Sequence, residues 1–185
     1  MNTSLRAFKK KVLIHKNSFR RFLTSLEKNT PRKLDQLVML AEQQVWPETD
    51  CLRCANCCKT MTPTYTPGDI RRIAVHLGIT QDQFKLKWLR KERNTGDWLN
   101  KSTPCQFLNP MDNKCSIYEV RPADCAGFPH LSKKRMIDYM HVHKQNIESC
   151  PASFKLVEKM IVLVKTGRDK TGSPEVRKTE RPLEL

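Results

Sequence analysis

Long apolar stretches are missing from this sequence of 185 residues. No apolar run exceeds the length of Met160 to Val164, whereas a membrane-spanning helix needs about 20 such residues. The first residues also lack the apolar segment of a secretion signal, because lysines interrupt each candidate stretch. We therefore expect a cytoplasmic protein without a transmembrane segment. The absence of acidic residues before Glu27 also fits a mitochondrial transit peptide, although a basic surface helix has the same composition.

Aromatic and acidic residues are scarce. Aromatic residues make up 7% of the chain, so apolar burial is expected to form a modest core that bound metal would help to hold. Lysine and arginine number 34 against 19 acidic residues, which gives a net charge of +15. Such a charge attracts nucleic acid, an anionic membrane or an acidic protein partner. A divalent metal with four thiolates keeps about two negative charges, so nearby cations could equally compensate a metal site.

Residues 1–46 are predicted to form a basic helical arm. Apolar residues recur at alternating intervals of three and four between residues 4 and 28, which indicates one amphipathic helix. Thr30 and Pro31 then supply an N-cap and a first-turn proline for a second helix. The short connection predicts that the two helices are antiparallel and lie side by side.

Helical signals continue in the centre of the chain. Thr66 and Asp69 resemble a capping box ahead of a helix that Gly78 would end, and Thr80 begins a further helix. This pair is similar to a DNA-reading helix-turn-helix, but Lys87 stands where that unit needs an apolar residue, so a hairpin that braces metal loops is favoured. Nucleic acid stays open as a partner because basic residues concentrate here, namely Arg71, Arg72, Lys85, Lys87, Arg90, Lys91 and Arg93.

The remaining sequence is turn-rich and then helical again. Residues 96–124 contain several prolines and are expected to hold at most a short hairpin around Cys105 and Cys115. Helices are predicted for residues 136–147 and from Cys150 onward. These segments complete a cysteine-cluster metal-binding domain at residues 47–165, and the polar residues 166–185 are predicted to be a disordered tail.

The eight cysteines are the most informative feature of the chain. In a reducing compartment, clustered thiols are more often metal ligands or redox groups than disulfides. In Cys51-x2-Cys54-x2-Cys57-Cys58, the two-residue spacing lets tight turns aim successive thiolates at one centre. Neighbouring side chains tend to diverge, so Cys57 and Cys58 either serve different metals or contribute one ligand between them.

This cluster needs further ligands from elsewhere in the chain. Equal gaps separate the next three cysteines, which suggests loops that return to a common point. Eight thiolates would complete two four-cysteine sites, and the alternative is one site with several free buried cysteines. The predicted metal ligands are Cys51, Cys54, Cys57, Cys58, Cys105, Cys115, Cys125 and Cys150.

A series of ordered motifs accompanies these cysteines. After the cluster come Pro63, the segment Asp69-Ile-x-Arg-Ile-Ala-x-x-Leu-Gly, Phe84, Cys105-x-Phe-Leu, and Cys115-x-Ile-Tyr-Glu-x-Arg-Pro with Cys125 and Phe128-Pro129. With these motifs the sequence resembles the YkgJ-type CxxCxxCC cysteine-cluster proteins over residues 51–150. The resemblance implies zinc or iron chelation and names no reaction. The family usually has an arginine where this chain has Ala126, which weakens a role for a cation there.

The spacing does not identify the metal. Zinc takes closed tetrahedral sets of Cys or His ligands, and iron-sulfur centres also accept four thiolates. We favour zinc or mononuclear iron and keep an iron-sulfur cluster open. His130 lies near Cys125 and is the best reserve ligand, whereas His141 and His143 face different directions on a helix.

The sequence thus predicts a mainly helical fold, with irregular cysteine-rich loops gathered around one or two metal sites. It predicts a metal-binding protein and leaves any reaction undefined. Two alternatives remain, an iron-sulfur redox or catalytic protein and a nucleic-acid-binding module that zinc only structures. Expected partners are a metal ion and either an acidic protein or nucleic acid.

Overall fold

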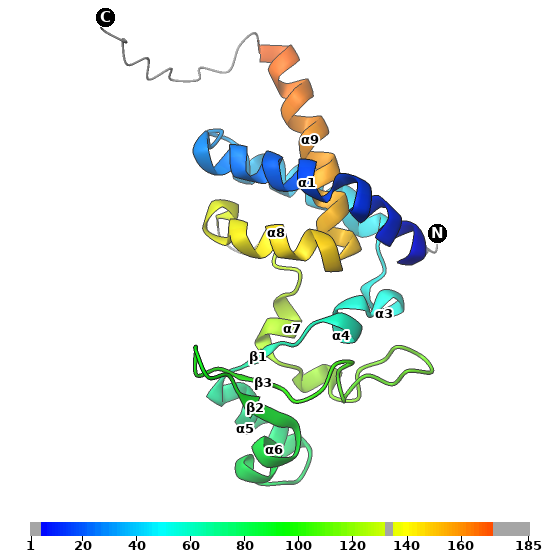
Figure 1. The fold of residues 1–185 in the computed structure, drawn as a ribbon, viewed down its shortest axis with the longest axis vertical. Coiled ribbons are helices and arrows are strands. Elements are labelled where there is room, and N and C mark those ends of the chain that lie inside the picture. The colour runs from blue at the N-terminus through cyan, green and yellow to red at the C-terminus, as the bar shows by residue number, and fades with distance from the viewer. Residues whose placement is uncertain (1–4, 132–134, 172–185) are drawn as a thin grey trace, which may run out of the picture.

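The computed structural model describes residues 5–131 and 135–171 of the chain. Its fold is mainly helical, as predicted, and has two separate hydrophobic cores. Figure 1 shows long helices at one end of the molecule, the sheet with two shorter helices at the other end, and the short helices α3, α4 and α7 between them. Most of the cysteines belong to this middle region, because the short helices there contain Cys51, Cys54, Cys57, Cys58 and Cys125.

The first core lies within a bundle of four helices. α1 packs against α8 and α9, and α2 packs against α9. Phe19 and Phe154 meet in this core with ring centroids 4.7 Å apart. Several cations of α1 form ion pairs with acids of its neighbours, such as Lys11 with Glu158 at 3.5 Å. The bundle consists of α1 (Leu5–Lys28), α2 (Leu34–Val45), α8 (Met140–Ser149) and α9 (Pro151–Thr171).

The second core joins two helices to a small antiparallel sheet. Ile70, Ile73 and Phe84 are buried here, together with Phe107 and Ile117 from the following loop. The strand order is β1-β3-β2, and β3 pairs with Tyr65 through Trp98 and with Leu89 through Asn100. The elements are β1 (Thr64–Tyr65), α5 (Pro67–His76), α6 (Gln81–Trp88), β2 (Leu89–Lys91) and β3 (Trp98–Asn100).

The predicted capping box at Thr66 and the predicted helix start at Thr80 are confirmed. The Thr66 hydroxyl accepts a hydrogen bond from the Asp69 amide, and the Asp69 carboxylate accepts one from the Thr66 amide. Thr80 and Gln83 make the same reciprocal pair at the start of α6. Gly78 has a φ of 66°, the left-handed conformation expected of a residue that ends a helix.

The predicted start of the second helix is wrong. α2 begins at Leu34, and the Thr30 hydroxyl donates to the Leu26 carbonyl at 2.9 Å, so that it serves the end of α1 instead of capping α2. The three-stranded sheet was not predicted, because strands of two or three residues are too short to show an alternating pattern. Further short helices are α3 (Cys51–Cys54), α4 (Asn56–Thr60), α7 (Ala123–Gly127), η1 (Trp46–Glu48), η2 (Tyr118–Val120) and η3 (Met136–Tyr139).

The boundaries of the predicted arm, domain and tail remain predictions. The predicted arm supplies α1 and α2, which share a core with α8 and α9. α9 continues to Thr171, past the predicted start of the tail, and residues 172–185 lie outside the described residues. Across the described part of the chain, no helix combines the length and apolar character that crossing a membrane requires.

Candidate metal centre

The first four cysteines lie on two consecutive helical turns. The Asp50 carboxylate accepts hydrogen bonds from the Leu52 and Arg53 amides at 3.0 and 3.1 Å, which caps α3. Ala55 has a φ of 45°, and this left-handed residue ends α3 and begins α4. Cys51 and Cys54 thus lie on one turn, and the adjacent Cys57 and Cys58 lie on the next.

Cys105 and Cys115 reach the same region on a loop. The Cys105 amide donates to the Cys58 carbonyl at 2.8 Å, which ties the loop directly to α4. An isolated antiparallel bridge joins Leu108 to Cys115. It fits the short hairpin that was expected around these two cysteines.

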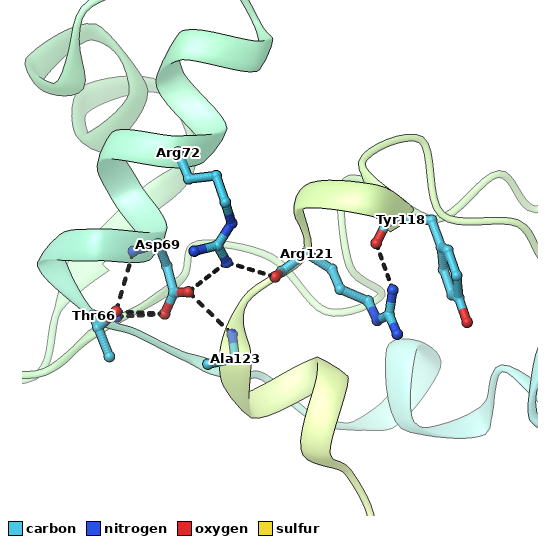
Figure 2. A network of polar contacts seen from close by, with 6 residues as sticks. All are labelled: Thr66, Asp69, Arg72, Tyr118, Arg121 and Ala123. Carbon is cyan, nitrogen blue, oxygen red and sulfur yellow. Dashed lines mark hydrogen bonds and ion pairs between the residues drawn. The ribbon is translucent and has the colours of Figure 1, made fainter.

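Cys125 is positioned by two buried or half-buried carboxylates. Asp69 in α5 accepts a hydrogen bond from the Ala123 amide at 3.1 Å, at the start of α7 (Figure 2). Arg72 bridges the Asp69 carboxylate and the Arg121 carbonyl at 2.7 and 2.9 Å. Asp124 accepts a hydrogen bond from the Thr64 amide at 3.1 Å. These contacts fasten α7 to the second core, and so fix where Cys125 stands.

A cavity of about 240 Å³ opens between these segments. Its walls include apolar or aromatic side chains such as Tyr65, Phe107, Ile117 and Phe128. Cys54 and Cys150, in contrast, lie outside its wall. The cysteines that line it are Cys51, Cys57, Cys58, Cys105, Cys115 and Cys125.

Most thiols of this cavity resist ionisation in the absence of a cation, and Cys58 is the exception. Burial raises the pKa of Cys125, and the negative charges of Cys58 and Cys105 raise it further. Burial also raises the pKa values of Cys105 and Cys115. A metal ion reverses this preference, because its positive charge stabilises the thiolates that repel one another.

Cys57 and Cys58 affect each other's ionisation. Their sulfur atoms are 4.0 Å apart. A hydrogen bond from Cys57 lowers the pKa of Cys58 to about 7 and raises that of Cys57. Cys58 is therefore the more readily ionised thiol of the pair, and it lines the cavity.

The sulfurs do not yet form a closed ligand set. Among residues 5–131 and 135–171, no group of three or more Cys, His, Asp or Glu side chains has the geometry to hold a metal ion. Metal–sulfur bonds of about 2.3 Å place tetrahedral sulfur ligands roughly 3.8 Å apart. Metal binding would thus require side-chain rotation inside a backbone arrangement that already brings the segments together.

Cys150 approaches from the bundle side. Its residue is 6% exposed and directly precedes α9. The Asn56 amide group donates to the Ser149 carbonyl at 2.6 Å, which places the α3–α4 turn beside this cysteine. Cys54 lies on the same turn and is half-buried.

The histidines occupy different environments. His130 is buried and its Nε2 lies 3.1 Å from the Asp124 carboxylate. His143 is buried as well, and burial together with the charges of His130 and His141 lowers its pKa to about 4. His141 is exposed, so the expected divergence of His141 and His143 is confirmed. The reserve role of His130 as a ligand stays a prediction.

Arg121 lies at the cavity wall. Its guanidinium stacks over the Tyr118 ring at 3.8 Å and donates to the Tyr118 carbonyl at 2.7 Å (Figure 2). Burial raises the pKa of Cys115, and the Arg121 charge partly offsets that rise. The positioning roles of Asp69 and Asp124 were not predicted, because the sequence gives no sign that either carboxylate binds the amide of a distant residue.

The comparisons with known proteins agree with the motifs. Residues 50–151 match the CxxCxxCC family, which is described as "Putative zinc- or iron-chelating domain". Since the match spans more than half of the sequence, the chain belongs to this family, and the resemblance seen in the motifs is confirmed.

A curated relative gives no further function. Uncharacterized protein MJ0661 of Methanocaldococcus jannaschii is 33% identical over 86 residues, which cover 46% of each sequence. This chain therefore spans less than half of the length of that relative. No solved structure matches the chain.

Proposed function

We propose that this chain binds a zinc or iron ion in the cavity between its two cores, with Cys58, Cys105, Cys115 and Cys125 as ligands. One observation carries the proposal: these four cysteines are among the six that line one cavity, although they come from segments far apart in the sequence. Four thiolates are a ligand set that both metals accept.

The backbone supports this ligand set from three directions. Cys105 is tied to α4 by the hydrogen bond that its backbone amide donates to the Cys58 carbonyl. The bridge from Leu108 holds Cys115, and the Asp69 carboxylate holds the segment that leads to Cys125. Preorganised segments lower the entropic cost of bringing distant ligands to one ion.

The chemistry of the donors also fits. Burial beside apolar walls makes unpaired thiolates costly at Cys105, Cys115 and Cys125, and a bound metal ion would offset this cost. A bound ion would supply positive charge and a link between the loops. Arg121 would add a cation beside Cys115, where it can offset part of the remaining negative charge.

The test is metal analysis of the full chain after anaerobic purification. Wild type should contain zinc or iron in stoichiometric amount, and Cys115→Ser should lose the cavity ion. Ser116→Ala is the matched control, because this neighbouring residue is exposed and makes its contact to Phe107 through the backbone amide. Wild type without zinc or iron, or a Cys115→Ser variant with full metal content, would contradict the proposal.

A second candidate is an iron-sulfur centre in the same cavity. The cavity volume of about 240 Å³ favours a multi-atom cluster, because one water-sized group occupies only about 10–15 Å³ of a cavity measured in this way. Brown protein with visible absorption and acid-labile sulfide would identify the cluster. Colourless protein with zinc would exclude it in favour of a single ion.

A further inference from the structure

We infer that the four remaining cysteines form a second metal centre, with Cys51, Cys54, Cys57 and Cys150 as ligands, where the α3–α4 turn meets the start of α9. The inference rests on the proposed function, because it assumes that thiols of this chain bind zinc or iron. It assigns each cysteine to one of two four-thiolate sets.

The α3–α4 turn provides three of these ligands. Cys51 and Cys54 are three residues apart on α3, so their side chains share one face of a helical turn. The Asp50 cap fixes the start of this turn. The left-handed Ala55 then changes the direction of the chain, so that Cys57 follows on a new helix. Cys51 and Cys57 belong to different helices, and both line the cavity of the first proposed centre, so that the two centres would adjoin there.

The Asn56 side chain fixes this turn against the bundle. Asn56 is 5% exposed, and its hydrogen bond to the Ser149 carbonyl is 2.6 Å long. The next residue is Cys150, whose amide donates to the Asn146 carbonyl at 2.7 Å at the end of α8. α4 also packs against α8. The fourth ligand is therefore brought to the turn by tertiary structure, since it lies far away in sequence.

The thiols of each set act on one another electrostatically. Burial raises the pKa of Cys51 to about 11, and the charges of Cys150 and Cys54 contribute to the rise. Burial likewise raises the pKa of Cys150, with a contribution from Cys54. Cys150 also raises the pKa of Cys57, after the stronger effects of the Cys58 hydrogen bond and of burial. Cys150 thus lies within electrostatic range of Cys51, Cys54 and Cys57, in line with the position that the Asn56 hydrogen bond gives it.

The two centres would adjoin at Cys57 and Cys58, whose sulfurs are 4.0 Å apart. This assignment explains how adjacent cysteines can both be ligands, since each serves a different ion. It also gives the second centre a structural consequence. Because Cys150 lies between α8 and α9, two helices of the bundle core, the ion would fasten the bundle to the α3–α4 turn.

The experiment is an anaerobic titration of the reduced, metal-free full chain with cobalt(II). The thiolate-to-cobalt charge-transfer absorption measures how much cobalt is bound. Wild type should take up two equivalents. Cys150→Ser and Cys115→Ser should each take up one, and the double variant should take up none. Ser116→Ala should match the wild type.

Other results separate the two claims. Wild type that takes up one equivalent, lost in Cys115→Ser and kept in Cys150→Ser, would leave the cavity site intact and overturn the second centre. Loss of both equivalents in either single variant would overturn the division into two sets. No uptake by wild type would refute the proposed function itself.

Cadmium-113 NMR of the wild type provides a measurement that no variant's folding can affect. We expect two resonances, each with the downfield shift of a four-thiolate site. A single resonance, or shifts of sites with fewer sulfur ligands, would overturn the assignment.

Discussion

Replacement of Asp69 by Asn should destabilise the protein and loosen the segment that carries Cys125. The Asp69 side chain is only 2% exposed. Burial alone would raise its pKa, but hydrogen bonds from Thr66, Arg72 and Ala123 outweigh burial and leave the pKa below its ordinary value. The native state therefore holds this group as a carboxylate that accepts bonds at both oxygens.

The size of the expected loss of stability follows from the hydrogen bonds that Asp69 accepts. One carboxylate oxygen accepts from Thr66 at 2.7 and 2.9 Å, and the other accepts from Arg72 and Ala123 at 2.7 and 3.1 Å. Asparagine has one side-chain oxygen, so its NH2 group would face hydrogen-bond donors at the position of the other carboxylate oxygen. Hydrogen bonds to charged groups contribute about 1.5–3 kcal/mol each. Because Arg72 is 45% exposed and can regain water, we expect a net loss of about 2–3 kcal/mol.

Thermal unfolding of the reduced, metal-free chain is the assay. A loss of that size corresponds to a decrease in Tm of roughly 5–10 °C for a chain of this length. The contribution of a carboxylate with a lowered pKa is complete above its unfolded pKa and disappears as the pH falls through its folded pKa. The difference between wild type and variant should thus be constant from pH 7 to about pH 5 and shrink below about pH 4.

Asp82→Asn is the matched control for this prediction. Asp82 also lies in the first turn of a helix and pairs with a cation three residues later, Lys85, but its side chain is 93% exposed. Its replacement should cost less than about 0.5 kcal/mol. If both variants unfold at the same temperature, the Asp69 network does not hold the α7 segment.

Three further predictions follow from single positions and from charge. Burial lowers the pKa of His143 to about 4, so the free energy of unfolding should decrease by about 3 kcal/mol as the pH falls from about 6.5 to about 4. Urea titrations at several pH values should show that this pH dependence is weaker in His143→Gln and unchanged in His141→Gln. Gly78→Ala should cost about 1 kcal/mol in urea unfolding because φ is 66°, whereas Gly68→Ala, inside α5 and without that strain, should be neutral or stabilising; equal effects would contradict the backbone argument. Gel-shift titrations should show no salt-sensitive binding of the wild type to DNA or RNA, and tight binding that weakens steeply with salt would favour a nucleic-acid role.

Local signals in the sequence predicted the helices well. The two capping boxes and Gly78 define α5 and α6, because each of these contacts is made within a few residues of the chain. The same local logic failed at Thr30, whose hydroxyl could serve either neighbouring helix. It serves α1, since α2 begins only at Leu34.

The site was predictable only as an inventory of residues. The cysteine spacing indicated which residue types would chelate metal, and the chain's family agrees with that chemistry. The spacing could not show that Cys150 meets the α3–α4 turn, because that contact depends on the Asn56 bond to Ser149. Nor could it show that Asp69 reaches the Ala123 amide. Both are tertiary hydrogen bonds between distant segments, which periodicity and capping rules do not describe.

The positions of the basic residues change the interpretation of the chain's positive charge. Lys11, Lys16 and Arg20 of α1 pair with acids of α8 and α9, so they help to dock the helices of the bundle. Arg72 and Arg121 hold the segment that leads to Cys125. Each proposed centre would replace four neutral thiols by four thiolates around a divalent ion and so subtract about two charges. The formal +15 already counts the paired acids. The two proposed metal sites would lower it by about four further charges, which weakens the inference from net charge to an anionic partner.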